Sequence, residues 1–81
     1  MEIREYTYEV PGAYCVAFRL PPVSARSIAL TLERNEAIRK LDLIKTDSFK
    51  FGGKYAGNDL YFPTDAARQQ FLTWKSLKWV L

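Results

Sequence analysis

The strongest constraint on the fold is a stretch near the end of the chain, where an aromatic strand stops at a proline and a capped helix follows at once. Residues 60–62 favour a strand, and Pro63 ends it because proline has no N–H to donate to a sheet ladder. Thr64 is a good helix N-cap, and Asp65 places a negative charge where it opposes the helix dipole. Apolar residues then recur at the spacing of one helix face, at Ala67, Phe71 and Trp74. The stretch predicts a β-strand followed by an amphipathic helix.

The first twenty residues predict a β-hairpin. Residues 3–10 alternate between apolar and polar side chains, which is typical of a half-buried strand, and its apolar row consists of Tyr6, Tyr8 and Val10. Pro11 and Gly12 suit the centre of a type II turn, because glycine tolerates positive φ. Residues 13–20 alternate again, between a bulky row and a small row. We expect the small row to let a helix approach the sheet closely; it consists of Ala13, Cys15 and Ala17.

The middle of the chain has no single periodicity. Residues 27–32 alternate like a strand, whereas Ser24 could equally cap a helix that runs to Leu41. On one long helix, Ile28 and Leu32 would point away from the other apolar residues, so we favour a short strand at 27–32 and a helix at 34–41. Residues 48–51 predict another short strand. The glycine-rich segment 52–59 predicts a loop or a wide hairpin end, and residues 77–81 predict a terminal strand or an extended tail.

Together these elements predict one α+β domain over residues 1–81. We expect a small antiparallel sheet of four or five strands, with one or two helices packed on one face. A chain of 81 residues has room for a single core. No apolar run approaches the roughly 20 residues that cross a bilayer, and the first residues lack a signal-peptide pattern. Cys15 is the only cysteine, so no internal disulfide can form, and we expect a cytoplasmic protein without a membrane partner.

The residue types argue against catalysis. The chain has no histidine, which removes the commonest general base and the commonest metal ligand. A lone cysteine excludes zinc sites built from several cysteines, and Cys15 is expected to be a small buried hydrophobe. The nearest carboxylate pairs lie beside turn and cap signals, where aspartate has a local backbone role; they are Asp42 with Asp47 and Asp59 with Asp65. We therefore predict no catalytic residue, no metal, no cofactor and no enzymatic activity.

Two segments suggest binding instead. Between residues 45 and 55, lysines interleave with aromatic rings, which are the ingredients of single-stranded nucleic-acid binding. The candidate residues are Lys45, Phe49, Lys50, Phe51, Lys54 and Tyr55. On a strand, Phe49 and Phe51 would share a face. The alternative is an ordinary amphipathic strand that buries both rings and leaves the lysines in solvent.

The second segment is the apolar C-terminus, which ends on Trp79, Val80 and Leu81. The tail either pairs as a strand of the sheet or forms a contact surface for another chain, and both readings stay open. A terminal strand could also pair with its own copy, giving a homo-oligomer. The predicted protein-interface residues are Tyr55, Leu72, Lys75 and Trp79.

Residues 60–74, from Leu60-Tyr61-Phe62-Pro63-Thr64 through the Phe71 and Trp74 helix, resemble the ending of many small bacteriophage accessory proteins. That resemblance implies a compact α+β protein of phage origin that binds and redirects a host enzyme, a defence factor or an RNA. It carries over no functional residue. Our prediction is a non-catalytic inhibitor or modulator of a larger host or defence protein, acting by steric occlusion in the host cytoplasm. The alternative is a small RNA or single-stranded DNA binding protein.

Overall fold

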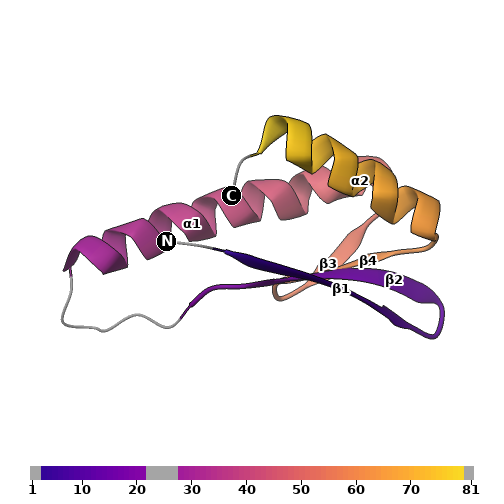
Figure 1. Ribbon diagram of the computed structural model, residues 1–81, viewed down its shortest axis with the longest axis horizontal. Coiled ribbons are helices and arrows are strands. Elements are labelled where there is room, and N and C mark those ends of the chain that lie inside the picture. Colours follow the sequence, from indigo (N-terminus) through magenta and orange to yellow (C-terminus); the bar gives the residue numbers. More distant parts are fainter. Residues whose placement is uncertain (1–2, 22–27, 80–81) are drawn as a thin grey trace.

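The computed structural model describes residues 3–21 and 28–79, with the backbone alone for residues 28–30. The elements are β1 (Arg4–Val10), β2 (Ala13–Arg19), α1 (Ile28–Asp47), the short 3-10 helix η1 (Ser48–Phe51), β3 (Lys54–Ala56), β4 (Asp59–Phe62) and α2 (Asp65–Lys78). The strands form one antiparallel sheet in the order β1-β2-β4-β3. Both helices lie on the same side of that sheet (Figure 1). The predicted α+β class is confirmed, with four strands and two helices.

The strand register decides which side chains face the helices. Residues directly opposite each other in an antiparallel pair share a face. Val16 of β2 lies opposite Leu60 of β4, and Tyr14 lies opposite Phe62. These bulky rows meet the helices, whereas the small row of β2 faces the other way. The expectation that a helix packs on the small row is wrong, because burying the bulky rows removes more apolar surface from water.

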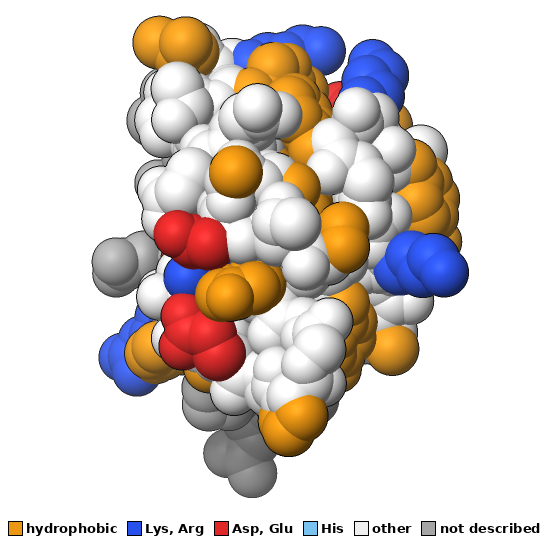
Figure 2. All heavy atoms as spheres, turned by 90° about the vertical axis from the view of Figure 1, so that its right-hand side faces the viewer, with side chains coloured by type: hydrophobic (Ala, Val, Ile, Leu, Met, Phe, Trp, Pro, Cys, Tyr) orange, Lys and Arg blue, Asp and Glu red, His pale blue; other side chains and the backbone are white. Residues whose placement is uncertain are grey.

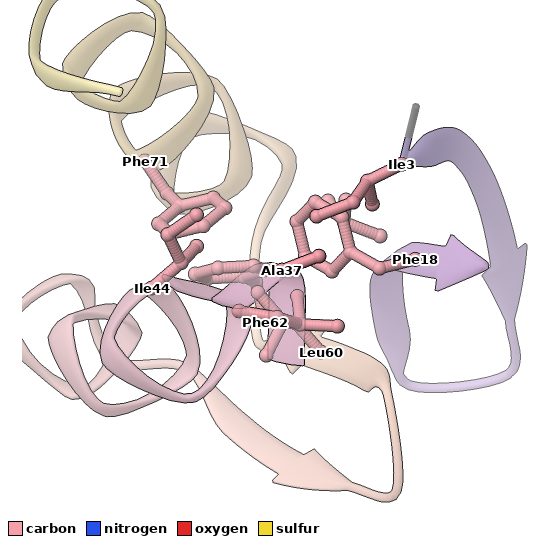
Figure 3. Close-up of a cluster of buried hydrophobic side chains, with 9 residues drawn as sticks. Ile3, Phe18, Ala37, Ile44, Leu60, Phe62 and Phe71 are labelled. Atoms are coloured by element: carbon pink, nitrogen blue, oxygen red, sulfur yellow. The ribbon is translucent and has the colours of Figure 1, made fainter. Parts of the chain in front are cut away.

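The core lies between the sheet and the two helices. Phe71 of α2 packs on Phe62 of the sheet with Ile44 of α1 beside it, and Phe18 lies next to Ile3 on the other side of the same cluster (Figure 3). All of these side chains are buried. Of the stripe predicted on α2, Phe71 is fully buried, and Ala67 and Trp74 pack against the same cluster. Thr64 caps the helix as predicted, its hydroxyl accepting a hydrogen bond from the Ala67 N–H at 3.1 Å.

Helix α1 corrects the prediction for the middle of the chain. The helix begins at Ile28, so a strand at 28–32 is wrong, while residue 27 lies outside the described residues. From residue 31 onward, where its side chains are described, its buried positions are Ala37, Leu41 and Ile44, a narrow stripe at helical spacing. The first turns of α1 extend past the ends of the strands (Figure 1). Leu32 lies in these first turns and is 59% exposed, so its apolar side chain does not belong to the core.

The segment from Ser48 to Ala56 also differs from the prediction. Residues 48–51 form the 3-10 helix η1 and not a strand. The turn is closed by hydrogen bonds from the Gly52 N–H to the Phe49 carbonyl and from the Gly53 N–H to the Ser48 carbonyl, at 3.1 and 3.0 Å. The expected loop or wide hairpin end contains the three-residue strand β3, which pairs with β4.

At the C-terminus, α2 continues through Lys78, so a strand beginning at Leu77 is wrong. Residues 80–81 of the predicted tail lie outside the described residues. Leu77 and Lys78 are helical, while Trp79 is extended, and pairing of a terminal strand with its own copy stays a prediction. Within the described ranges, neither helix has the length and apolar character needed to cross a membrane.

Candidate functional site

The side of the sheet opposite the helices carries an aromatic and basic surface, which we call the tyrosine face. The register places all its members on this side: Tyr6, Tyr8, Tyr61, Arg4, Arg19 and Lys54. Tyr6 is 49% exposed, and Arg4 and Lys54 are exposed as well. The small row of β2 lies between the tyrosines of β1 and β4, so Cys15 is fully buried although no helix covers it.

Asp59 holds the centre of the tyrosine face in place. The Tyr8 hydroxyl donates a hydrogen bond to Oδ2 of Asp59 at 2.7 Å, and the Arg19 guanidinium donates to Oδ1 at 2.7 Å. The hydrogen bond from Arg19 holds the pKa of Asp59 below its ordinary value. Hydrogen bonding to Asp59, and then to Tyr61, raises the pKa of the Tyr8 hydroxyl. Tyr8 is therefore a neutral, oriented ring at physiological pH.

The charge of the tyrosine face is positive. Among the described residues that the register places on this side, Asp59 is the only carboxylate, against three cations. Arg19 neutralises that carboxylate. Arg4 and Lys54 flank the tyrosines from the two outer strands, so a ligand lying across the sheet would meet a cation at either edge.

The residues predicted for nucleic-acid binding are divided between three places. Phe49 and Tyr55 form an exposed aromatic pair, with ring centroids 5.5 Å apart and exposures of 54% and 45%. Phe51 turns inward onto Phe71 and Trp74, because the 3-10 turn separates two rings that a strand would align. Lys54 points to the tyrosine face.

Lys45 and Lys50, the two other lysines predicted to bind nucleic acid, differ in how firmly neighbouring groups hold their ammonium groups. The Lys45 ammonium donates to the Gly57 carbonyl at 2.9 Å and lies 5.2 Å from the Tyr55 ring centroid, so it fastens α1 to the β3–β4 turn. Lys50 is 69% exposed and lies 3.6 Å from an Asp47 carboxylate oxygen. Exposed ion pairs of this kind are weak, which leaves Lys50 available to a ligand.

The predicted protein-interface residues do not form one surface. Leu72 and Trp79 are partly buried and pack against the core cluster. The Lys75 side chain is 11% exposed, and its ammonium lies 2.8 Å from a Glu5 carboxylate oxygen. Tyr55 is the member of this set that remains substantially exposed.

Arg68 has a structural role that the sequence prediction missed. Its guanidinium donates to the carboxylates of Glu9 and Asp65 at 2.8 and 2.9 Å, and to the Tyr8 carbonyl at 3.2 Å. The hydrogen bond to Glu9 raises the pKa of Arg68 further. The seven-residue spacing of Arg68 and Lys75 is the signal that could have found this role, since both face inward and bind β1 to α2.

The described residues contain no group of three or more side chains suited to hold a metal ion. No family model, no curated protein and no solved structure matches this chain. What the protein binds must therefore be inferred from its own surface.

Proposed function

We propose that this protein is a non-catalytic domain that binds single-stranded nucleic acid on the tyrosine face. The observation that carries the proposal is the register, which gathers three tyrosines and three cations on the side of the sheet that the described helices leave uncovered. Bases stack on aromatic rings without regard to sequence, and phosphates are neutralised by neighbouring Lys and Arg. An open sheet face offers both kinds of contact to a flexible strand at once.

The hydrogen bonds at the centre of the tyrosine face, which hold its side chains in place before a ligand binds, support the proposed binding of single-stranded nucleic acid. Because Asp59 already fixes the Tyr8 hydroxyl and the Arg19 guanidinium, less side-chain freedom is lost when a ligand binds. The neutral Tyr8 phenol also carries no negative charge that would repel a phosphate.

A single strand fits this surface better than a duplex. Reading a DNA duplex requires an element that enters a groove, usually a helix with exposed basic residues. The inward-facing cations of α2, Arg68 and Lys75, are already held in ion pairs with β1. On α1, exposed cations such as Arg39 and Lys40 alternate with the acids Glu36 and Asp42.

Fluorescence anisotropy with labelled ten-nucleotide RNA and DNA strands tests the proposal. Replacing Tyr6 by alanine should weaken binding about tenfold, because one stacked base contributes about 1–3 kcal/mol. The matched control is Tyr55→Ala, which removes a tyrosine of nearly equal exposure from the other side of the sheet. If Tyr55→Ala is the weaker binder and Tyr6→Ala is not, the Phe49–Tyr55 pair is the site and the tyrosine face is not.

Salt dependence supplies an independent check. Because Arg19 is already paired with Asp59, two phosphate contacts, at Arg4 and Lys54, predict that the logarithm of the binding constant falls with the logarithm of salt concentration with a slope of roughly −1.4. Lys54→Gln should make that slope shallower by about 0.7. Binding that ignores salt, or strands that do not bind at all, would contradict the proposal.

The predicted phage-type inhibitor of a host or defence protein remains a second candidate, favoured by a different observation. A shallow apolar groove on α2 is lined by Gln69, Gln70, Thr73, Trp74 and Leu77. Leu77 is 83% exposed at its end, and an exposed apolar side chain beside a tryptophan suits a protein interface. A pull-down from host lysate tests this candidate. It predicts that a host protein stays bound after nuclease treatment and that the Leu77→Glu variant no longer binds that protein. Retention by the variant would rule this groove out.

A further inference from the structure

A hollow of about 270 Å³ adjoins the tyrosine face at the end of the molecule that carries the β1–β2 turn. Figure 2 views this end, where hydrophobic side chains are scattered, basic ones lie mostly at the periphery, and acidic ones gather toward one side. The hollow is lined by Gly12, Ala13, Gly52, Lys54, Tyr61, Phe62 and Pro63. Two of these residues, Lys54 and Tyr61, also belong to the tyrosine face, so the hollow and the face are continuous.

The hollow follows from the order of the strands. β4 lies between β2 and β3, and it ends at Phe62, just before Pro63. Ala13 of β2 therefore borders the hollow on one side, and Gly52 and Lys54 border it on the other. Residues 61–63 lie between these two borders.

Two of the lining residues are glycines in turns. Gly12 and Gly52 have φ values of +83° and +79°, a left-handed conformation that favours glycine over other residues. A Cβ atom at Gly12 would meet no atom within 4 Å, and one at Gly52 would meet only the Pro63 ring at 4.0 Å. Both turns therefore line the hollow with backbone alone.

The chemistry of the lining suits a flat apolar ring joined to an anion. Tyr61, Pro63 and Ala13 offer apolar surface, and Lys54 is the one charged residue in the lining. The volume lies just below the range of about 300–1,000 Å³ that is usual for drug-sized ligands, and it is large enough to admit one base.

We infer that this hollow, which we call the base pocket, receives one base of the strand bound on the tyrosine face, while Lys54 contacts the adjoining phosphate. The inference rests on the proposed function and adds to it a defined binding position for one base. A strand crossing from Tyr6 towards Lys54 places its last base at the base pocket.

The test uses two substitutions of the same kind on the same side of the sheet. Ala13→Leu fills the base pocket, and Ala56→Leu adds an identical side chain at an exposed position outside its lining. Amide chemical shifts are followed by NMR while a four-nucleotide strand, as uridine RNA or thymidine DNA, is added to each 81-residue variant. A tetramer whose bases are replaced by hydrogen supplies the phosphates alone. Thermal unfolding confirms that each variant is folded.

The expected result is a shift of the Gly12 and Gly52 amides that requires bases. It should be present with the intact tetramer, absent with the base-free tetramer, lost in Ala13→Leu and kept in Ala56→Leu. Affinity for the intact tetramer should fall about tenfold in Ala13→Leu, the loss of one stacked base.

Three outcomes overturn the inference in distinguishable ways. Shifts confined to Tyr6, Tyr8 and their neighbours leave the proposed function standing and remove the base pocket. Equal shifts at Gly12 and Gly52 with the base-free tetramer show phosphate binding and no base. An absence of shifts anywhere with RNA and DNA removes the proposed function and the base pocket together.

Discussion

At the scale of single residues, Asp59 links the stability of the protein to its candidate binding face. One carboxylate accepts hydrogen bonds from a phenol and a guanidinium that come from two other strands. Charge-assisted hydrogen bonds of this kind are stronger than neutral ones. The tyrosine face is thus held together by the same contacts that set its charge.

The pH dependence of stability tests this role of Asp59. Folding lowers the pKa of Asp59 below 3.8, so the ionised carboxylate stabilises the folded state at neutral pH. That contribution is lost as the pH falls below 3.8 and through the folded pKa. Asp59→Asn should therefore lower the free energy of unfolding at pH 7, and the difference from the unmodified protein should shrink in acid. Urea unfolding across pH measures this, with Glu36→Gln, a substitution at an exposed carboxylate of α1, as control. A difference that stays constant with pH would contradict it.

At the scale of elements, the sequence predicts what local signals determine and misses what distant pairing determines. Helix α2 was predictable because its cap at Thr64 and its stripe through Phe71 agree. In α1 the alternating apolar residues at 28–32 fit a strand as well as a helix. Only packing against the sheet shows that the buried side of the helix consists of Ala37, Leu41 and Ile44.

The candidate site was harder to predict than the elements. Tyr6 and Tyr8 were recognised as one row, yet the side they face depends on the pairing of β2 with β4, which lie far apart in sequence. The tyrosine face draws one or more residues from each of four strands, so no local pattern reveals it. The composition of residues 45–55 predicts a binding segment, but the 3-10 turn at residues 48–51 points its rings in different directions.

The junction between η1 and β3 yields a prediction about Gly53. A Cβ atom there would lie 2.8 Å from Cε1 of Phe62 and 3.0 Å from the Ser48 carbonyl oxygen. Since neither the buried ring nor the backbone oxygen can give way easily, Gly53→Ala should lower the free energy of unfolding by about 2 kcal/mol. Gly57→Ala, whose methyl would meet nothing within 4 Å, should cost only the strain of its positive φ, about 1 kcal/mol. An equal or larger loss at Gly57, measured in urea, would contradict the steric argument.

At the scale of the whole molecule, the first strand and the last helix are fastened together. Arg68 and Lys75 of α2 reach Glu9 and Glu5 on the helix-facing side of β1. Trp79 then packs against the core beyond the end of α2. The two ends of the described chain therefore stabilise one unit.

Trp79 decides whether the end of the chain belongs to the core or to an interface. Trp79→Ala should lower the free energy of unfolding by about 2 kcal/mol, because it removes a large, partly buried ring. Leu77→Ala, two residues earlier and 83% exposed, should change it by less than about 0.5 kcal/mol. Chemical denaturation of both variants measures the difference. Unchanged stability in Trp79→Ala would return this residue to the list of contact residues.

The burial of Cys15 has a practical consequence for studying the sheet. The thiol is the only one in the chain, and it is fully buried between Tyr8 and Tyr61 on the uncovered side. A thiol reagent can reach it only when neighbouring strands separate or a tyrosine swings aside. The rate at which the reagent labels Cys15 therefore reports the opening of the tyrosine face. A nucleic-acid strand bound across that face would slow the labelling, and no engineered probe is needed to measure it.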